Sequence, residues 1–67
     1  MLKPGTRVIL RQSEERGIVL HTWIDPETLD NDCYVAFFGK QWPEEQQYIQ
    51  PNKPYVLRYF ESSLEVV

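Results

Sequence analysis

Residues that could carry chemistry are few and scattered along this 67-residue chain. The only histidine, His21, and the only cysteine, Cys33, are the candidates for nucleophilic catalysis or metal binding. A Cys–His nucleophile needs a third residue that orients the base, and a zinc site needs about four ligands. The sequence offers neither set, so we expect both to be structural side chains. We therefore expect that the chain is not an enzyme and that it has no catalytic residue, metal or cofactor.

Four acids follow closely after His21, and carboxylates at such spacing are typical of calcium loops. They are Asp25, Glu27, Asp30 and Asp32. A calcium-binding loop of the helix–loop–helix type that began at Asp25 would need glycine at its sixth position and glutamate at its twelfth. The chain has Asp30 and Ala36 there. The pattern therefore predicts a solvated hairpin tip.

The strongest binding candidates are aromatic residues in a polar, proline-containing segment, residues 40–54, and just after it. Trp42 and Tyr48 lie within the segment, Tyr55 follows it, and Arg58 supplies the nearest charge. Exposed aromatic rings in such a loop are typical of surfaces that hold a protein partner. In the alternative interpretation, Trp42 folds back and plugs one end of the core.

A basic strip near the start of the chain suggests nucleic acid as an alternative partner. Lys3, Arg7 and Arg11 form it, and they can contact phosphates. The formal net charge of the whole chain is −3, which argues against strong nonspecific binding to nucleic acid. The same three residues also suit the solvent face of an edge strand, where charge discourages aggregation.

Length and composition indicate one domain, residues 1–67, that depends on its apolar core for stability. A single cysteine excludes an intrachain disulfide and fits a reducing compartment. The sequence contains no run of about 20 apolar residues, which a membrane-spanning helix requires. We therefore expect a cytoplasmic protein that has no contact with membranes.

Alternating apolar residues and turn signals predict five short strands. The expected strands are residues 7–11, 18–24, 33–38, 55–60 and 64–67. Pro43 is placed to begin one helical turn, and residues 61–63 suit a 3₁₀ turn. This pattern predicts an all-β fold, a five-stranded SH3-like barrel with a long insertion, residues 40–54, between its third and fourth strands. The expected core comprises Val8, Val19, Val35, Phe37, Leu57 and Leu64.

The register between the second and third strands has two solutions. One pairs Ile24 with Cys33, so that Trp23 lies opposite Tyr34. The other is shifted by one residue and pairs Val19 with Phe37. A one-residue shift exchanges the two faces of a strand. The pattern of small barrels favours the second pairing, and simple alternation places Val19 and Trp23 on the same side of their strand.

Short motifs at both ends and in the centre resemble the broad superfamily of SH3-like small barrels. They are Pro-Gly-Thr-Arg-Val at 4–8, Gly-Ile-Val at 17–19, Tyr-Val-Ala-Phe at 34–37 and Ser-Leu-Glu-Val at 63–66. The group includes KOW domains, Tudor-type domains and small accessory subunits of photosynthetic complexes. The segment 40–54 departs from this group, and no strongly basic KOW loop is present. The resemblance implies the small-barrel fold rather than a particular function. Because such barrels are binding modules more often than enzymes, we expect a small non-catalytic module that binds a protein.

Overall fold

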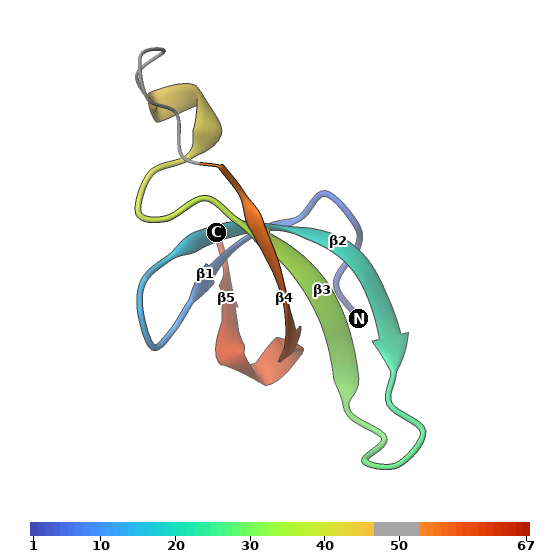
Figure 1. Ribbon diagram of the computed structural model, residues 1–67. Coiled ribbons are helices and arrows are strands. Elements are labelled where there is room, and N and C mark those ends of the chain that lie inside the picture. The colour runs from blue at the N-terminus through green and yellow to red at the C-terminus, as the bar shows by residue number, and fades with distance from the viewer. Residues whose placement is uncertain (47–52) are drawn as a thin grey trace.

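The computed structural model describes residues 1–46 and 53–67, which form a five-stranded antiparallel sheet in the order β4-β3-β2-β1-β5 (Figure 1). This confirms the all-β prediction. The sheet is open, with β4 and β5 at its edges, and is not closed into a barrel. The strands are β1 Arg7–Leu10, β2 Arg16–Ile24, β3 Asn31–Phe37, β4 Tyr55–Phe60 and β5 Leu64–Val66.

Two 3₁₀ turns occur where the sequence predicts a turn. The turn η1, Pro43–Glu45, has proline at its first position, where the missing N–H costs no hydrogen bond. The turn η2, Glu61–Ser63, joins β4 directly to β5. No helix in the described part of the chain is long and apolar enough to cross a membrane.

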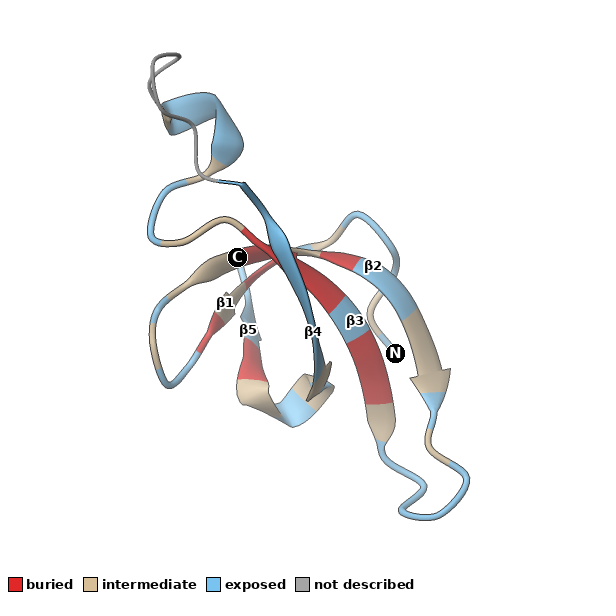
Figure 2. Ribbon diagram, viewed as in Figure 1, coloured by how far each residue is buried: buried red, intermediate tan, exposed pale blue. Residues whose placement is uncertain are grey.

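The core lies on one face of the curled sheet, here called the inner face (Figure 2). Its buried apolar residues come from every strand except β4 and are Val8, Leu10, Val19, Cys33, Val35, Phe37 and Leu64. Leu2 and Tyr59 pack against this cluster from its margins. Five of the six expected core residues are therefore confirmed.

Gly17 lets the first three strands approach at the centre of the core. It lies opposite Val8 on β1 and opposite Phe37 on β3. A β-carbon at this position would come within 2.5 Å of Val35 Cγ1 and 2.9 Å of Phe37 Cδ1. Only glycine leaves room for the buried ring of Phe37 over the backbone of β2.

The sixth expected core residue, Leu57, is exposed, and that prediction is wrong. Leu57 lies opposite Val35 and therefore on the inner face, but 42% of its surface is exposed. The reason is that β4 is an edge strand of an open sheet, so Leu57 has a neighbouring strand on only one side.

Both predicted registers between β2 and β3 are also wrong, because β2 contains an irregularity near Leu20. Val19 pairs with Val35, but His21 pairs with Tyr34, so the register shifts by one residue between them. Ile24 pairs with Asn31, which makes the connecting loop shorter than expected. A bulge of this kind exchanges the faces of the residues after it. Val19 therefore faces the core, whereas His21 and Trp23 lie on the opposite, outer face.

The core predicts a large loss of stability when Phe37 is replaced by alanine. Its side chain has no exposed surface, so Phe37→Ala should lower the free energy of unfolding by about 3–5 kcal/mol. A loss of this size approaches the total stability of a small domain, so the variant should be largely unfolded. Circular dichroism and urea unfolding would measure this. Phe60→Ala is the matched control, because Phe60 is 39% exposed, and an equal loss there would contradict the prediction.

Candidate binding surfaces

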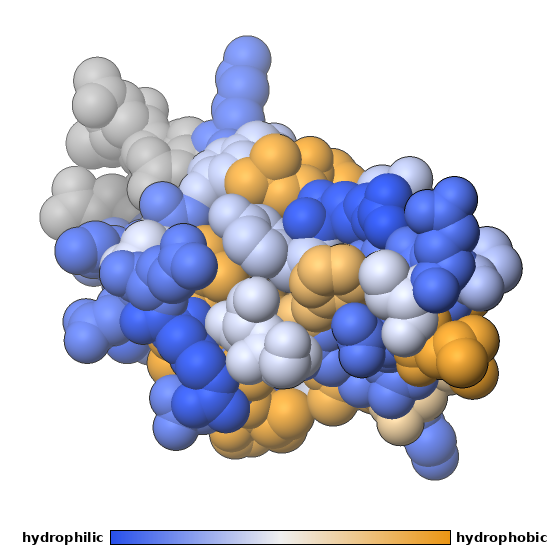
Figure 3. Space-filling model, turned by 90° about the horizontal axis from the view of Figure 1, so that it is seen from below, coloured by the Kyte–Doolittle hydropathy of each residue, from blue (hydrophilic) through white to orange (hydrophobic). Residues whose placement is uncertain are grey.

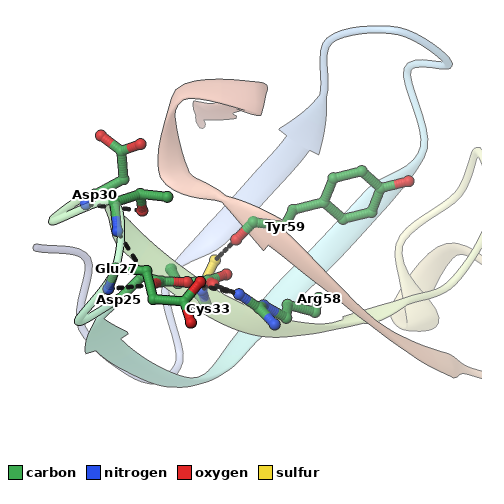
Figure 4. A network of polar contacts seen from close by, with 8 residues as sticks. Asp25, Glu27, Asp30, Cys33, Arg58 and Tyr59 are labelled. Atoms are coloured by element: carbon green, nitrogen blue, oxygen red, sulfur yellow. Dashed lines mark hydrogen bonds and ion pairs between the residues drawn. The ribbon is translucent and has the colours of Figure 1, made fainter.

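A fully buried carboxylate, Asp32, holds Arg58, the only charged residue of β4. Figure 4 shows Arg58 beside the loop that carries Asp25. Arg58 donates from Nε to Asp32 Oδ2 at 2.6 Å, and Asp32 Oδ1 accepts the backbone N–H of Cys33 at 3.0 Å. Asp32 lies between Trp23 on β2 and Phe60 on β4 in the paired strands. A buried charge needs such partners, because desolvation otherwise costs several kcal/mol. This interaction ties β4 to β3.

The loop between β2 and β3 joins the same network through Asp25. One oxygen of Asp25 accepts the backbone N–H groups of Glu27 and Thr28, and the other accepts Arg58 Nη2 at 2.9 Å. These two backbone N–H groups, followed by the positive charge of Arg58, hold the pKa of Asp25 below its ordinary value of 3.8. The hydrogen bond to Asp32 in turn raises the pKa of Arg58.

Aromatic rings cover the outer face beside this network. Trp23 lies 4.8 Å from Tyr34 and 5.8 Å from His21, measured between ring centroids. The guanidinium carbon of Arg58 is 5.7 Å from the centroid of Trp23. An indole ring can hold a cation from a ligand, but here the protein's own arginine already takes that position. We name Trp23, Tyr34, Arg58, Asp25 and Asp32 the Arg58 cluster.

The predicted site residue Trp42 also contacts an arginine of the chain. It is half-buried outside the core cluster, and the guanidinium carbon of Arg7 lies 4.7 Å from its ring centroid. Arg7 Nη1 forms an ion pair with Glu44 Oε1 at 2.6 Å. Arg7, the middle residue of the predicted nucleic-acid strip, therefore already has a partner within the chain. The other two residues of the strip, Lys3 before β1 and Arg11 directly after it, are exposed.

The remaining predicted binding residues are not brought together. Tyr48 lies outside the described residues. Tyr55 is on the inner face at the start of β4, with its ring 5.7 Å from that of Phe37. Arg58 is three positions further along and points to the outer face. Tyr55 and Arg58 thus belong to the same strand, but their side chains lie on opposite faces of the sheet.

Asp32, Asp25, Trp23 and Tyr34 were not predicted as site residues. A signal for Asp32 was present in the sequence. Arg58 is the only charge within Tyr55–Phe60, and a lone charge in such an apolar strand calls for an opposite charge on the neighbouring strand. The signal for Trp23 was missing, because simple alternation assigns it the wrong face.

Two shallow pockets flank the exposed ring of Phe60 at the end of the molecule that carries η2. The larger, about 330 Å³, also has Asp32 and Arg58 in its lining, and the smaller, about 240 Å³, includes Asp30. Seen from below, apolar and hydrophilic residues alternate over this end without one large apolar patch (Figure 3). The two pockets share Phe60, and the rest of their lining is mostly polar, with Asn31, Glu61, Ser62 and Ser63 among the other residues.

Cys33 is an unreactive thiol in this arrangement. It is fully buried, and its Sγ lies 3.3 Å from the carbonyl oxygen of Tyr59, to which it donates. Burial, with smaller effects from Glu61 and Asp32, raises the pKa of the Cys33 thiol to about 11. Among the described residues, no three His, Cys, Asp or Glu side chains lie close enough together to hold a metal ion.

The depressed pKa of Asp25 predicts acid sensitivity. Its carboxylate stabilises the fold at pH values above 3.8, and this contribution should disappear as the pH falls below 3.8 and through the lowered folded pKa. Asp25→Asn should therefore be less stable than the unaltered chain at pH 7, and the difference should shrink toward pH 2. Urea unfolding at a series of pH values would measure it. Asp30→Asn, which removes an exposed carboxyl from the same loop, is the matched control, and an equal loss of stability there would contradict the prediction.

The raised pKa of Cys33 predicts slow chemical modification. At pH 8 the folded chain should react with a disulfide reagent such as Ellman's reagent roughly 100-fold more slowly than the urea-unfolded chain, because far less thiolate is present and the sulfur is buried. Absorbance of the released thiolate follows the reaction. Equal rates in the folded and unfolded chains would contradict the buried position.

Among the described strands, β4 carries the most exposed large apolar side chains. Tyr55, Val56, Leu57 and Phe60 are each more than a third exposed. Comparisons with models of protein families, with curated proteins and with solved structures find no match to this chain.

Proposed function

We propose that this chain is a small non-catalytic module of the SH3-like barrel type, which binds a protein partner in the cytoplasm along the edge of β4. The strand order, the 3₁₀ turn η2 before β5 and the pairing of β5 with β1 support this fold type. In it, the segment 40–54 is an insertion before β4. The buried, reduced thiol of Cys33 fits a reducing compartment.

The edge of β4 is the observation that carries the proposal. Within residues 1–46 and 53–67, no strand pairs with the side of β4 that faces away from β3. An edge strand leaves backbone N–H and C=O groups available to an extended segment of another protein. Apolar side chains on both faces of β4 would add contacts above and below such a segment.

The two edges of the sheet differ in how they are protected. Proteins usually guard an exposed edge by keeping the strand short or by placing a charge on it. The strand β5 has both devices, because it spans Leu64–Val66 and carries Glu65 at its centre. The strand β4 is twice as long, and its one charge, Arg58, is held by Asp32. Of the two edge strands, β4 is therefore the better suited to accept another strand.

The proposal predicts that a charge on β4 abolishes partner binding. Leu57→Lys places an ammonium group on the edge strand at a residue that is already exposed, so the domain should stay folded. Leu20→Lys is the matched control, because Leu20 is 47% exposed but lies in β2, away from the edge of β4. Tagged chains would be used to capture proteins from the native host, and each captured protein would then be purified and bound directly.

The expected result is capture by the unaltered chain and by Leu20→Lys, and loss of capture by Leu57→Lys. Hydrogen exchange of the purified complex should show slowed exchange for the amides of Tyr55–Phe60. Full capture by Leu57→Lys, or slowed exchange confined to the segment around Trp42, would show that the partner binds elsewhere.

A further inference from the structure

We propose that the strand accepted by β4 is β4 of a second copy of this chain, arranged antiparallel about a twofold axis. This inference rests on the proposed role of the β4 edge and specifies its partner. Antiparallel pairing of identical edges presents the same surface on both copies, which is the usual geometry of a symmetric dimer. The pairing would continue the sheet from one copy into the other.

Charge on β4 does not oppose this pairing. The one charged side chain of the strand, Arg58, is bound to Asp32 and Asp25 of its own chain. Two β4 strands can therefore approach without bringing an unpaired charge to the edge. On β5, two copies of Glu65 near the centre of a short strand would repel each other, so the same pairing is disfavoured at the opposite edge.

The faces of the sheet restrict the register of the pairing to a few choices. A twofold axis perpendicular to the sheet keeps the inner faces of both copies on one side. Such an axis passes midway between one residue of β4 and the same residue of the second copy. An axis at Arg58 places two guanidinium groups opposite each other. An axis at Val56 pairs only residues 55–57 within β4, whereas an axis at Leu57 pairs residues 55–59. The Leu57 axis therefore gives the longer ladder without opposed guanidinium groups, so we assign the axis to Leu57.

The Leu57 register also explains why an inner-face leucine lies uncovered in the single chain. It places Leu57 opposite Leu57 of the second copy and Tyr55 opposite Tyr59 of that copy. The rings of Tyr55 and Tyr59 each lie 5.7 Å from the ring of Phe37 in the core. The pairing would therefore extend the core of each copy into one apolar row across the dimer, in which Leu57 is covered.

Single cysteine variants test the register directly. Leu57→Cys should form a disulfide-linked dimer under mild oxidation, because directly opposed residues lie within disulfide range. Val56→Cys is the control, because this residue would lie diagonally from its copy at roughly 7–8 Å. The unaltered chain should not cross-link, because Cys33 is buried and its pKa of about 11 leaves little thiolate. Non-reducing gel electrophoresis would resolve the 8.0 kDa chain from its dimer.

Sedimentation equilibrium from about 1 μM to about 1 mM tests the association without modification. The average mass of the unaltered chain and of Leu20→Lys should rise from 8.0 kDa toward twice that value, whereas Leu57→Lys should remain at 8.0 kDa. Val56→Lys is a second variant, for use if Leu57→Lys is misfolded by circular dichroism. It should also stay monomeric, because the Leu57 register sets this lysine opposite Arg58 of the second copy.

Constant mass of the unaltered chain over this range, with no cross-linking of Leu57→Cys, would overturn the inference. Preferential cross-linking at position 56 would overturn it as well, because the register would differ. Neither result alone decides the proposed function, which is measured by hydrogen exchange with a captured protein. If the captured protein is this chain itself, slowed exchange in β4 supports both claims. Slowed exchange in β4 by a different protein keeps the proposed function and rejects the second copy as partner, whereas slowed exchange elsewhere rejects both.

Discussion

The ring of Phe37 lies over the bare backbone of Gly17, and this close contact brings the sheet together. Gly17 pairs with β1 on one side and β3 on the other, so a single position joins three strands. A methyl group there would collide with Phe37 and with Val35. In a domain of 67 residues few other apolar contacts can compensate, because the core is one thin layer. The positions of both edge strands follow from this centre.

The ion pair between buried Asp32 and half-exposed Arg58 has a different role from that of the apolar core. Solvent screens a pair with an exposed member, so it is weak as a source of stability. It is strong as a constraint, because Asp32 has its partner only when Arg58 stands near it in the β3–β4 ladder. This constraint has a cost at the surface. An arginine held inward by Asp32 no longer repels another strand from the edge of β4.

Local signals in the sequence predicted the elements of this fold well. Proline at position 43 and the turn residues before Leu64 marked both 3₁₀ turns, and β4 begins and ends where its apolar run does. The register of β2 could not be predicted, because the irregularity near Leu20 has no local signal such as glycine.

The candidate surfaces were harder to predict than the elements. Strand alternation placed Leu57 on the correct face, but burial depends on whether a neighbouring strand covers that face, and an edge has none. Tyr55 and Arg58 were recognised as residues of interest, yet the partners of Arg58 became visible only once β3 was placed beside β4. The local pattern of a single sequence does not show which residues of distant segments contact each other, so the contact between Arg58 and Asp32 could not be predicted from it.

The ladder between β1 and β5 has a consequence for the synthesis of the protein. Val8 pairs with Val66 and Leu10 with Leu64, so this ladder joins segments separated by nearly the whole sequence. A ribosome releases the first strand long before the last one, and Leu64 contributes to the same core as Val8. The nascent chain must therefore wait with β1 unpaired on one side until Leu64 has left the exit tunnel. Contacts this distant in sequence are typical of slow folding, which makes the interval one in which the chain depends on protection from aggregation.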